Sequence, residues 1–209
     1  MQEAERLYRE GIARVPGSLT LRMSYIGFLD RGGRLDEAVQ ALEPLWQRVA
    51  LRPYLATGVH SVLSKKHEHS RCVRFMEEAL AVDPNNAYAW LYLGHNLTSL
   101  RDHGAAAETF TKALVLRPEN HPTRGLLARS LEQAGRLEEA ETHYRRFVEL
   151  EPNSEYGHHL FADFLARHRP ACRAEALQEA RMALRLHDGT ATDREKLIRL
   201  IQDLESRSE

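Results

Sequence analysis

Apolar and polar positions follow one another along the chain with the spacing of helices. In Trp90–Leu100 and Ala105–Leu116, apolar residues recur at intervals of three and four, which places them on one helix face. Pro84, Pro118 and Pro152 stand where a helix has to stop, because proline cannot continue one. No segment keeps the two-residue alternation of a strand. The pattern predicts an all-α protein built from short helices.

The helical pattern repeats every 34 residues, the interval that separates Pro84, Pro118 and Pro152. A row of small residues and a row of bulky ones keep the same interval: Ala4, Ala38, Cys72, Ala106 and Ala140, and Tyr8, Leu42, Met76, Phe110 and Tyr144. A fixed period of this length is typical of stacked helical hairpins. Small residues let the two helices of a hairpin approach, and bulky residues fill the space between hairpins. Stability is then expected to come from stacking, because no hairpin can bury its apolar face alone.

The repeated segment resembles a known family. The stretch WLYLGHNL (Trp90 to Leu97) is similar to the first helix of a tetratricopeptide repeat (TPR), with Trp90, Leu93 and Gly94 in the signature positions. The second helix and its terminator, and then a less complete following unit, match through these residues: Ala106, Phe110, Ala113 and Pro118; Leu127, Ala128, Gly135, Ala140, Tyr144 and Pro152. The resemblance implies a right-handed superhelical solenoid of TPR hairpins, whose first helices line a concave surface.

The period also sets the expected boundaries of the repeats. We expect the second helix of a truncated repeat in 1–18, TPR-like repeats in 19–52 and 53–86, TPRs in 87–120 and 121–154, a divergent TPR-like repeat in 155–188, and a C-terminal capping helix in 189–209. After Pro152 the period slips by two residues, and the insertion is expected within Arg167–Pro170. The capping helix is expected from about Asp193 to Ser206, with Thr192 and Glu195 as its capping box.

The first helix is expected to lack a partner. Its apolar face would carry Leu7, Tyr8, Ile12 and Val15, and a preceding first helix of the same hairpin is absent. We therefore expect the native protein to continue upstream, and we keep open that this face docks a second copy of the chain.

Charge and composition exclude some classes of partner. Lys and Arg number 29 against 30 Asp and Glu, so the chain lacks the basic excess that nucleic-acid binding requires. No apolar run is long enough to span a membrane, and the first residues do not form a signal peptide, which predicts a cytoplasmic protein. The two cysteines, Cys72 and Cys172, fit no metal or redox spacing and are expected to be buried thiols.

Catalytic and metal-binding patterns are also missing. His67-Glu68-His69 is expected in a solvated turn, and His158 and His159 would point apart on a helix, so neither pair is expected to chelate a metal. There is no glycine-rich phosphate loop and no hydrolase or metalloprotease motif. The sequence predicts a protein that is not an enzyme and needs no metal or cofactor.

A peptide-binding groove is the remaining functional prediction. One step of the period per hairpin aligns Tyr54, Tyr88 and Tyr156 in a single row of the first helices, and neighbouring rows contain His95, Arg129 and His159. Tyrosine combines apolar area with a polar tip, and Arg129 could bind a carboxylate bidentately. The two histidines are expected to add positive charge below about pH 6.5. The alternative, that some tyrosines pack against the neighbouring helix, stays open.

These observations favour a non-catalytic scaffold or adaptor that binds a peptide or partner helix in the concave groove. A chaperone-tail receptor is disfavoured, because Thr57, Ser61 and Leu91 stand where that TPR subclass has its lysines and asparagines. Two alternatives remain: the interaction arm of a larger enzyme, such as a glycosyl- or sulfotransferase, and a self-association module that forms homo-oligomers through the N-terminal helix.

Overall fold

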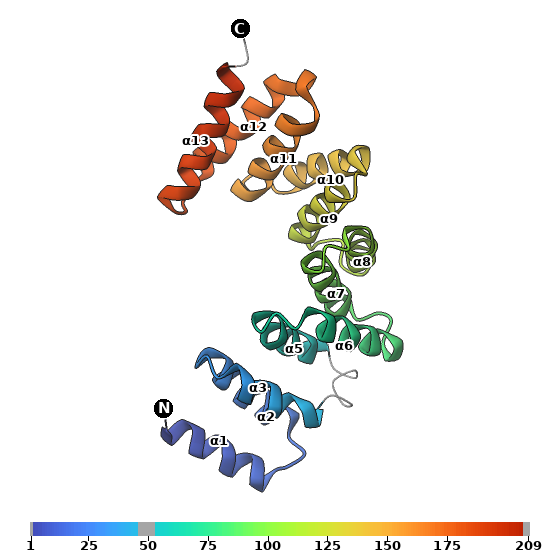
Figure 1. The fold of residues 1–209 in the computed structure, drawn as a ribbon, viewed down its shortest axis with the longest axis vertical. Helices are drawn as coiled ribbons and strands as arrows, with labels where there is room; N and C mark the ends of the chain where they lie inside the picture. The colour runs from blue at the N-terminus through green and yellow to red at the C-terminus, as the bar shows by residue number, and fades with distance from the viewer. Residues whose placement is uncertain (1, 46–52, 207–209) are drawn as a thin grey trace. The chain divides into compact units, whose positions relative to one another are not determined.

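The computed structural model describes residues 2–45 and 53–206, except for the side chains of residues 53–55 and 191. The described residues are helical apart from short turns, and they contain no strand, which confirms the all-α prediction. The chain forms two compact units, Met1–Leu116 and Arg117–Glu209 (Figure 1).

The first unit consists of helices joined by short turns. In chain order these are α1 (Gln2–Arg14), α2 (Leu19–Arg31), α3 (Leu35–Leu42) followed by the 3-10 turn η1 (Glu43–Leu45), α5 (Pro53–Lys65), α6 (His69–Val82), α7 (Ala87–Ser99) and α8 (His103–Leu116). Consecutive helices pack as pairs: α2 on α3, α5 on α6 and α7 on α8. Helix α5 also packs on α7, so the first helices of two adjacent hairpins are neighbours.

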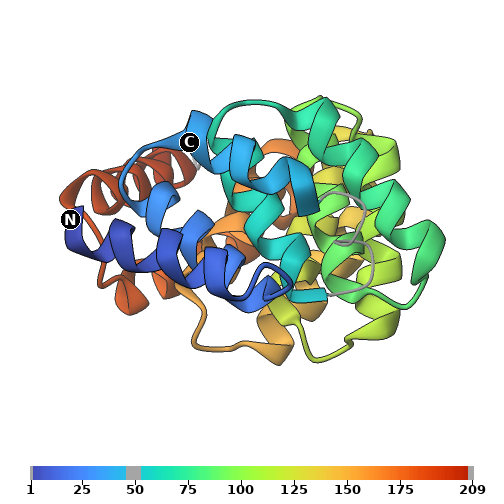
Figure 2. The ribbon, with the colours of Figure 1, turned by 90° about the horizontal axis from the view of Figure 1, so that it is seen from below.

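The second unit continues the same arrangement. Its elements are α9 (His121–Gln133), α10 (Leu137–Leu150), α11 (Glu155–His168), the 3-10 turn η2 (Pro170–Cys172), α12 (Arg173–Leu186) and α13 (Ala191–Ser206). Helix α9 pairs with α10 and α11 with α12, and α13 lies along α12 in both views (Figures 1 and 2). The division into the repeats proposed from the period stays a prediction.

The turns inside the hairpins share one backbone conformation. Gly33, His67, Arg101 and Gly135 stand 34 residues apart, and all have positive φ, at 71°, 57°, 64° and 77°. Each lies just after a first helix, where a left-handed residue ends the helix and reverses the chain. His67 of the His67-Glu68-His69 run is therefore a turn residue.

From Ala38 onward the two rows of the 34-residue period form the core, whereas Ala4 and Tyr8 of α1 are only partly buried. Ala38, Cys72, Ala106 and Ala140 are completely buried, and the bulky residues that follow them by four positions are at most 2 % exposed: Leu42, Met76, Phe110 and Tyr144. Tyr144 stacks on Phe161 and contacts Phe164 across the α10–α11 interface, as expected for a residue that fills the space between hairpins. The prediction of two buried thiols holds only for Cys72, since Cys172 is half-buried in η2.

The C-terminal part of the second unit differs from the regular repeat. Ala176, Ala180 and Ala183 are completely buried, as the two-residue slip requires, and η2 follows the predicted insertion. The predicted capping box was wrong: the hydroxyl of Thr190, not Thr192, accepts from the Asp193 amide at 3.3 Å and donates to the Asp193 carboxylate at 2.8 Å. Helix α13 begins two residues earlier than expected, and Leu197 and Leu204 anchor it.

Helix α1 covers part of α2. Tyr8 contacts the rings of Tyr25 and Phe28, at centroid distances of 5.7 and 5.5 Å. Leu7 of α1 and Val15, which follows the end of this helix, are 57 % and 56 % exposed. In the part of the chain that the structure describes, no helix has the length and apolar character needed to cross a membrane.

Candidate functional site

The six residues predicted to line a groove are divided between the two units. Tyr88 and His95 lie on α7 of the first unit, and Arg129 (α9), Tyr156 and His159 (α11) lie in the second. Tyr54 belongs to α5, but its side chain is outside the described residues. The structure brings Tyr88 and His95 into one cluster of rings, and Arg129 and Tyr156 into direct contact.

Four rings form the aromatic cluster of the first unit: His60 from α5, and Tyr88, Tyr92 and His95 from α7. The His60 and Tyr92 rings are stacked with centroids 4.5 Å apart, and the Tyr88 and Tyr92 rings are stacked with centroids 6.4 Å apart. His95 lies 5.7 Å from His60. Tyr88 is 39 % exposed, while the other three rings are half-buried. Tyr88 is therefore the ring of this cluster that is most exposed to solvent.

Below the cluster, the completely buried side chain of Asn96 connects three helices. Its amide nitrogen donates to the Tyr92 carbonyl at 2.6 Å and contacts Nδ1 of His60 at 3.0 Å and the Cys72 sulfur at 3.2 Å. Its oxygen is 3.1 Å from Nδ1 of His69. The Tyr92 carbonyl can only accept, so the group that faces it and His60 has to be the amide NH₂. Nδ1 of His60 is therefore an acceptor, and its proton is on Nε2.

The environment keeps the two histidines of the cluster neutral. Burial lowers the pKa of His60 to about 4, with contributions from the nearby imidazoles of His95 and His69. Burial also lowers the pKa of His95. The expectation that His95 adds positive charge below about pH 6.5 is therefore wrong, because desolvation disfavours its charged form.

The two helices that carry the cluster contain almost no charge. Helix α7 has no Asp, Glu, Lys or Arg, and α5 has only Lys65. Lys65 is neutralised by Asp30 of α2, at 2.7 Å from the carboxylate. The described face of α5 and α7 is thus an uncharged surface of rings, hydroxyls and imidazole N–H groups.

His60 and Tyr92 were not predicted from the sequence, although a signal for each exists. His60 stands in the row of Ile26, Gly94, Ala128 and Ala162, in which the three hairpins that follow it have a small residue. In the next hairpin, Gly94 makes room for the ring of Phe110. In the hairpin that contains His60, the residue equivalent to Phe110 is the flexible Met76. Tyr88, Tyr92 and Asn96 follow at intervals of four, which places them on one helix face.

The second unit offers a charged site instead. Nη1 of Arg129 lies 3.5 Å from the Tyr156 hydroxyl, and both side chains are exposed. Behind them, the buried carboxylate of Glu132 accepts from Tyr144 at 2.8 Å, from His168 at 2.9 Å and from Arg167 at 2.8 Å. Burial and the charge of Glu132 raise the pKa of Tyr144. Glu132 already has its partners, so the Arg129 guanidinium is available for an acidic group of a ligand.

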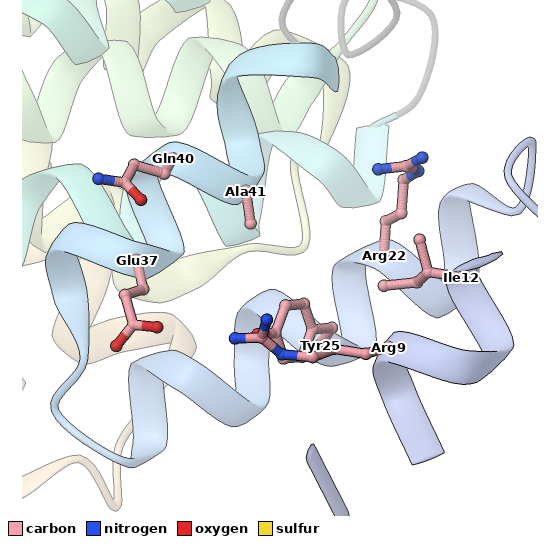
Figure 3. A pocket seen from close by; sticks show the side chains of 7 residues that line it. All are labelled: Arg9, Ile12, Arg22, Tyr25, Glu37, Gln40 and Ala41. Carbon is pink, nitrogen blue, oxygen red and sulfur yellow. The ribbon is translucent and has the colours of Figure 1, made fainter. Parts of the chain in front are cut away.

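A pocket of about 400 Å³ lies between α1, α2 and α3 (Figure 3). Its lining residues are Arg9, Ile12, Arg22, Tyr25, Glu37, Gln40 and Ala41. The charged groups around it pair with one another: Glu5 accepts from Arg34 at 2.5 Å and from Arg9 at 2.8 Å, and Arg34 also binds Glu37. Hydrogen bonds from Arg34 and Arg9 lower the pKa of Glu5 to about 2. Arg22, which also lines the pocket, donates to the Pro16 carbonyl at 3.1 Å and is not part of this ion-pair network.

Metal-ligating side chains do not gather in the described residues, where no group of three or more His, Cys, Asp or Glu could hold an ion. His158 is buried with both ring nitrogens in contact, Nδ1 with Glu179 at 2.5 Å and Nε2 with the Pro152 carbonyl at 3.0 Å.

Comparison with known sequences identifies the repeat. Residues 97–163 match the family model described as "Tetratricopeptide repeat". The chain is 25 % identical over 91 residues to anaphase-promoting complex subunit 3 of Schizosaccharomyces pombe, and 31 % identical over 70 residues to the cell division cycle protein 27 homolog of Caenorhabditis elegans. The matched segments are 44 % and 34 % of this chain, but they span only 14 % and 9 % of those relatives.

Solved structures share the fold over most of the chain. YrrB, described as a TPR protein with an unusual peptide-binding site, superimposes with a TM-score of 0.70 at 16 % identity, over 93 % of this chain and 97 % of YrrB. A fragment of MamA from Desulfovibrio magneticus superimposes with a TM-score of 0.69 at 18 % identity, over 88 % of this chain and 97 % of the fragment. At these identities the likeness concerns the fold.

Proposed function

Because this chain is a tetratricopeptide-repeat protein, we propose that it is a non-catalytic scaffold that binds an extended peptide or a partner helix along the first helices of its hairpins. The residues of this site are Tyr54, Tyr88 and His95 in the first unit, and Arg129, Tyr156 and His159 in the second. His60 and Tyr92 join them in the first unit.

The aromatic cluster is the observation that carries this proposal. Its rings come from two adjacent first helices, and Tyr88 is 39 % exposed although apolar area of this kind is stabilised by burial. Large rings on a rigid helical surface are typical anchors of protein interfaces, since they contribute much area at a low entropic cost. YrrB has the same fold and a peptide-binding site, which supports a similar use of this chain.

The second unit would bind an acidic group. Arg129 projects beside Tyr156, so a carboxylate of the ligand could accept from the guanidinium while Tyr156 covers its aliphatic part. Because burial lowers the pKa of His95, mild acidification should add less positive charge at this residue than at an exposed imidazole.

Peptides selected from a displayed random library on the immobilised chain would test this function. We expect selected peptides to bind the wild type, and their affinity to fall at least fivefold in Tyr88→Ala or Arg129→Ala. Val82→Ala, which shortens a residue 56 % exposed on α6, serves as the control and should keep the wild-type affinity. Circular dichroism establishes that each variant is folded. Unchanged affinity in both site variants would show that the peptides bind elsewhere than on the first helices.

A further inference from the structure

The aromatic cluster of the first unit has a chemistry that narrows the choice of ligand. It combines ring faces with hydrogen-bond donors, and it lacks ionic groups. Apart from histidines and tyrosines, α5 and α7 contain one ionisable side chain, Lys65. Its ammonium group is bound to Asp30. A charged peptide side chain would lose hydration here without gaining a partner.

Asn96 determines which hydrogen bond the cluster can offer. Its amide group faces Nδ1 of His60 at 3.0 Å, so the His60 proton is on Nε2. No hydrogen bond to Nε2 is found among the described residues, and this atom is not among the buried atoms that lack a partner. The cluster therefore presents an N–H donor beside the stacked Tyr92 ring, and a ligand needs a carbonyl acceptor at this point.

We propose that the aromatic cluster of His60, Tyr88, Tyr92 and His95 is a subsite for an uncharged, proline-containing extended segment of the partner. This inference rests on the proposed function and specifies the ligand of its first unit. Proline provides an apolar ring that can pack against the exposed Tyr88 side chain, and a carbonyl acceptor for His60. It has no N–H group, so its backbone leaves no donor unpaired on this surface.

The dimensions of the cluster suit such a segment. Neighbouring ring centroids are 4.5–6.4 Å apart along Tyr88, Tyr92, His60 and His95. A polyproline II chain rises about 3.1 Å per residue, so the spacing between neighbouring rings corresponds to about two residues of a bound peptide. This conformation is already extended in the free peptide, and the entropic cost of binding it is low.

Octaproline is the probe for this proposal. Titration of the full chain with fluorescently labelled octaproline should give saturable binding, and an octapeptide of alternating serine and glycine should not bind. We expect Tyr88→Ala and Tyr92→Ala each to weaken octaproline binding at least fivefold, and the control Val82→Ala to leave it within twofold. His60→Phe keeps a ring but removes the N–H donor, so it should weaken binding by about threefold or more.

The Nε2 resonance of His60 distinguishes direct binding from a purely structural role, because a structural role alone would not make this resonance respond to the ligand. Imidazole ¹⁵N shifts should show a neutral ring with its proton on Nε2 at pH 6, and the Nε2 signal should shift when octaproline is added. A ring protonated on Nδ1 would overturn the inference, as would octaproline binding that is absent or insensitive to the cluster variants. If library-selected peptides depend on Tyr88 while octaproline does not bind, the scaffold function stands and only the proline specificity falls.

Discussion

At the scale of single residues, the close approach of two helices depends on one glycine. A Cβ on Gly94 would lie 2.6 Å from Cε1 of the Phe110 ring, and Phe110 is itself 1 % exposed. The ring cannot yield without opening the α7–α8 contact. This steric demand explains why the residue that the TPR resemblance singled out is a glycine.

We therefore expect Gly94→Ala to lower the free energy of unfolding by about 1–3 kcal/mol, because it overpacks a rigid ring. Gly104→Ala is the matched control: no atom lies within 4 Å of the added methyl group, and Gly104 is inside α8, where alanine is favoured. Urea denaturation should show this control to be as stable as the wild type or more stable. Equal losses in both variants would contradict the packing argument.

The buried state of His60 makes stability depend on pH. Its pKa is about 4 in the folded protein and about 6.5 when unfolded, so between these values the unfolded chain binds more protons. Stability is then complete above about pH 6.5 and falls as the pH decreases toward 4. His95 adds to this effect in the same direction, since burial lowers its pKa as well.

We expect His60→Phe, which cannot titrate, to reduce this dependence. Because the His60 ring is partly exposed to solvent, its share should be about 1–2 kcal/mol between pH 7 and 4. Urea denaturation of both proteins at several pH values measures it: the difference in unfolding free energy between wild type and variant should change over this range. Parallel curves would mean that His60 remains accessible to protons in the folded state.

At the scale of the element, the four hairpin turns all need a residue with positive φ, and two of them have a residue other than glycine there. Glycine adopts positive φ without strain, and two of the four turns have it at this position, as Gly33 and Gly135. His67 and Arg101 adopt the same conformation at an energetic cost, since their Cβ atoms crowd the backbone. The equivalent residue after α11, Arg169, has a φ of −134° instead, and η2 begins at the next residue.

Replacing Arg101 with glycine should therefore stabilise the first unit by about 0.5–1 kcal/mol, the strain relieved less the added freedom of the unfolded chain. Arg101→Ala removes the same side chain but keeps Cβ, and we expect no gain from it. Thermal and urea melts of the two variants distinguish backbone strain from side-chain effects. A similar gain from alanine would attribute the effect to the arginine charge.

At the scale of the whole molecule, the two compact units separate two kinds of surface. The first carries the uncharged aromatic cluster, and the second carries Arg129 beside the satisfied carboxylate of Glu132. Stability should be divided in the same way, as in other repeat proteins in which each repeat contacts only its neighbours.

We expect mutations in different units to act independently. Tyr144→Phe removes the hydroxyl that donates to Glu132 at 2.8 Å, and its cost should add to that of Gly94→Ala within about 0.5 kcal/mol in the double variant. Gly94→Ala combined with Phe110→Leu is the contrasting pair, since these residues are in contact and the smaller side chain relieves the clash. Non-additivity of the first pair, measured by denaturant unfolding, would show that the two sites are coupled.

The sequence by itself determined the helical class, the period and the residues of the core. These features are local and repeated: a helix requires apolar residues at three- and four-residue spacing, and close packing requires the same small and bulky residues in every hairpin. Ala38, Cys72, Ala106 and Ala140 could be predicted as buried for this reason, and the two-residue slip after Pro152 could be read from the rows of alanines.

Only the tertiary structure decided how side chains from different helices meet. The stack of His60 on Tyr92, the Asn96 amide that holds the His60 proton on Nε2, and the choice of Thr190 as the helix cap all depend on distances between atoms that the period does not specify. The neutrality of His95 follows likewise from burial, which is a property of its surroundings. Packing therefore converted a row of aromatic and basic residues into one uncharged surface and one charged surface.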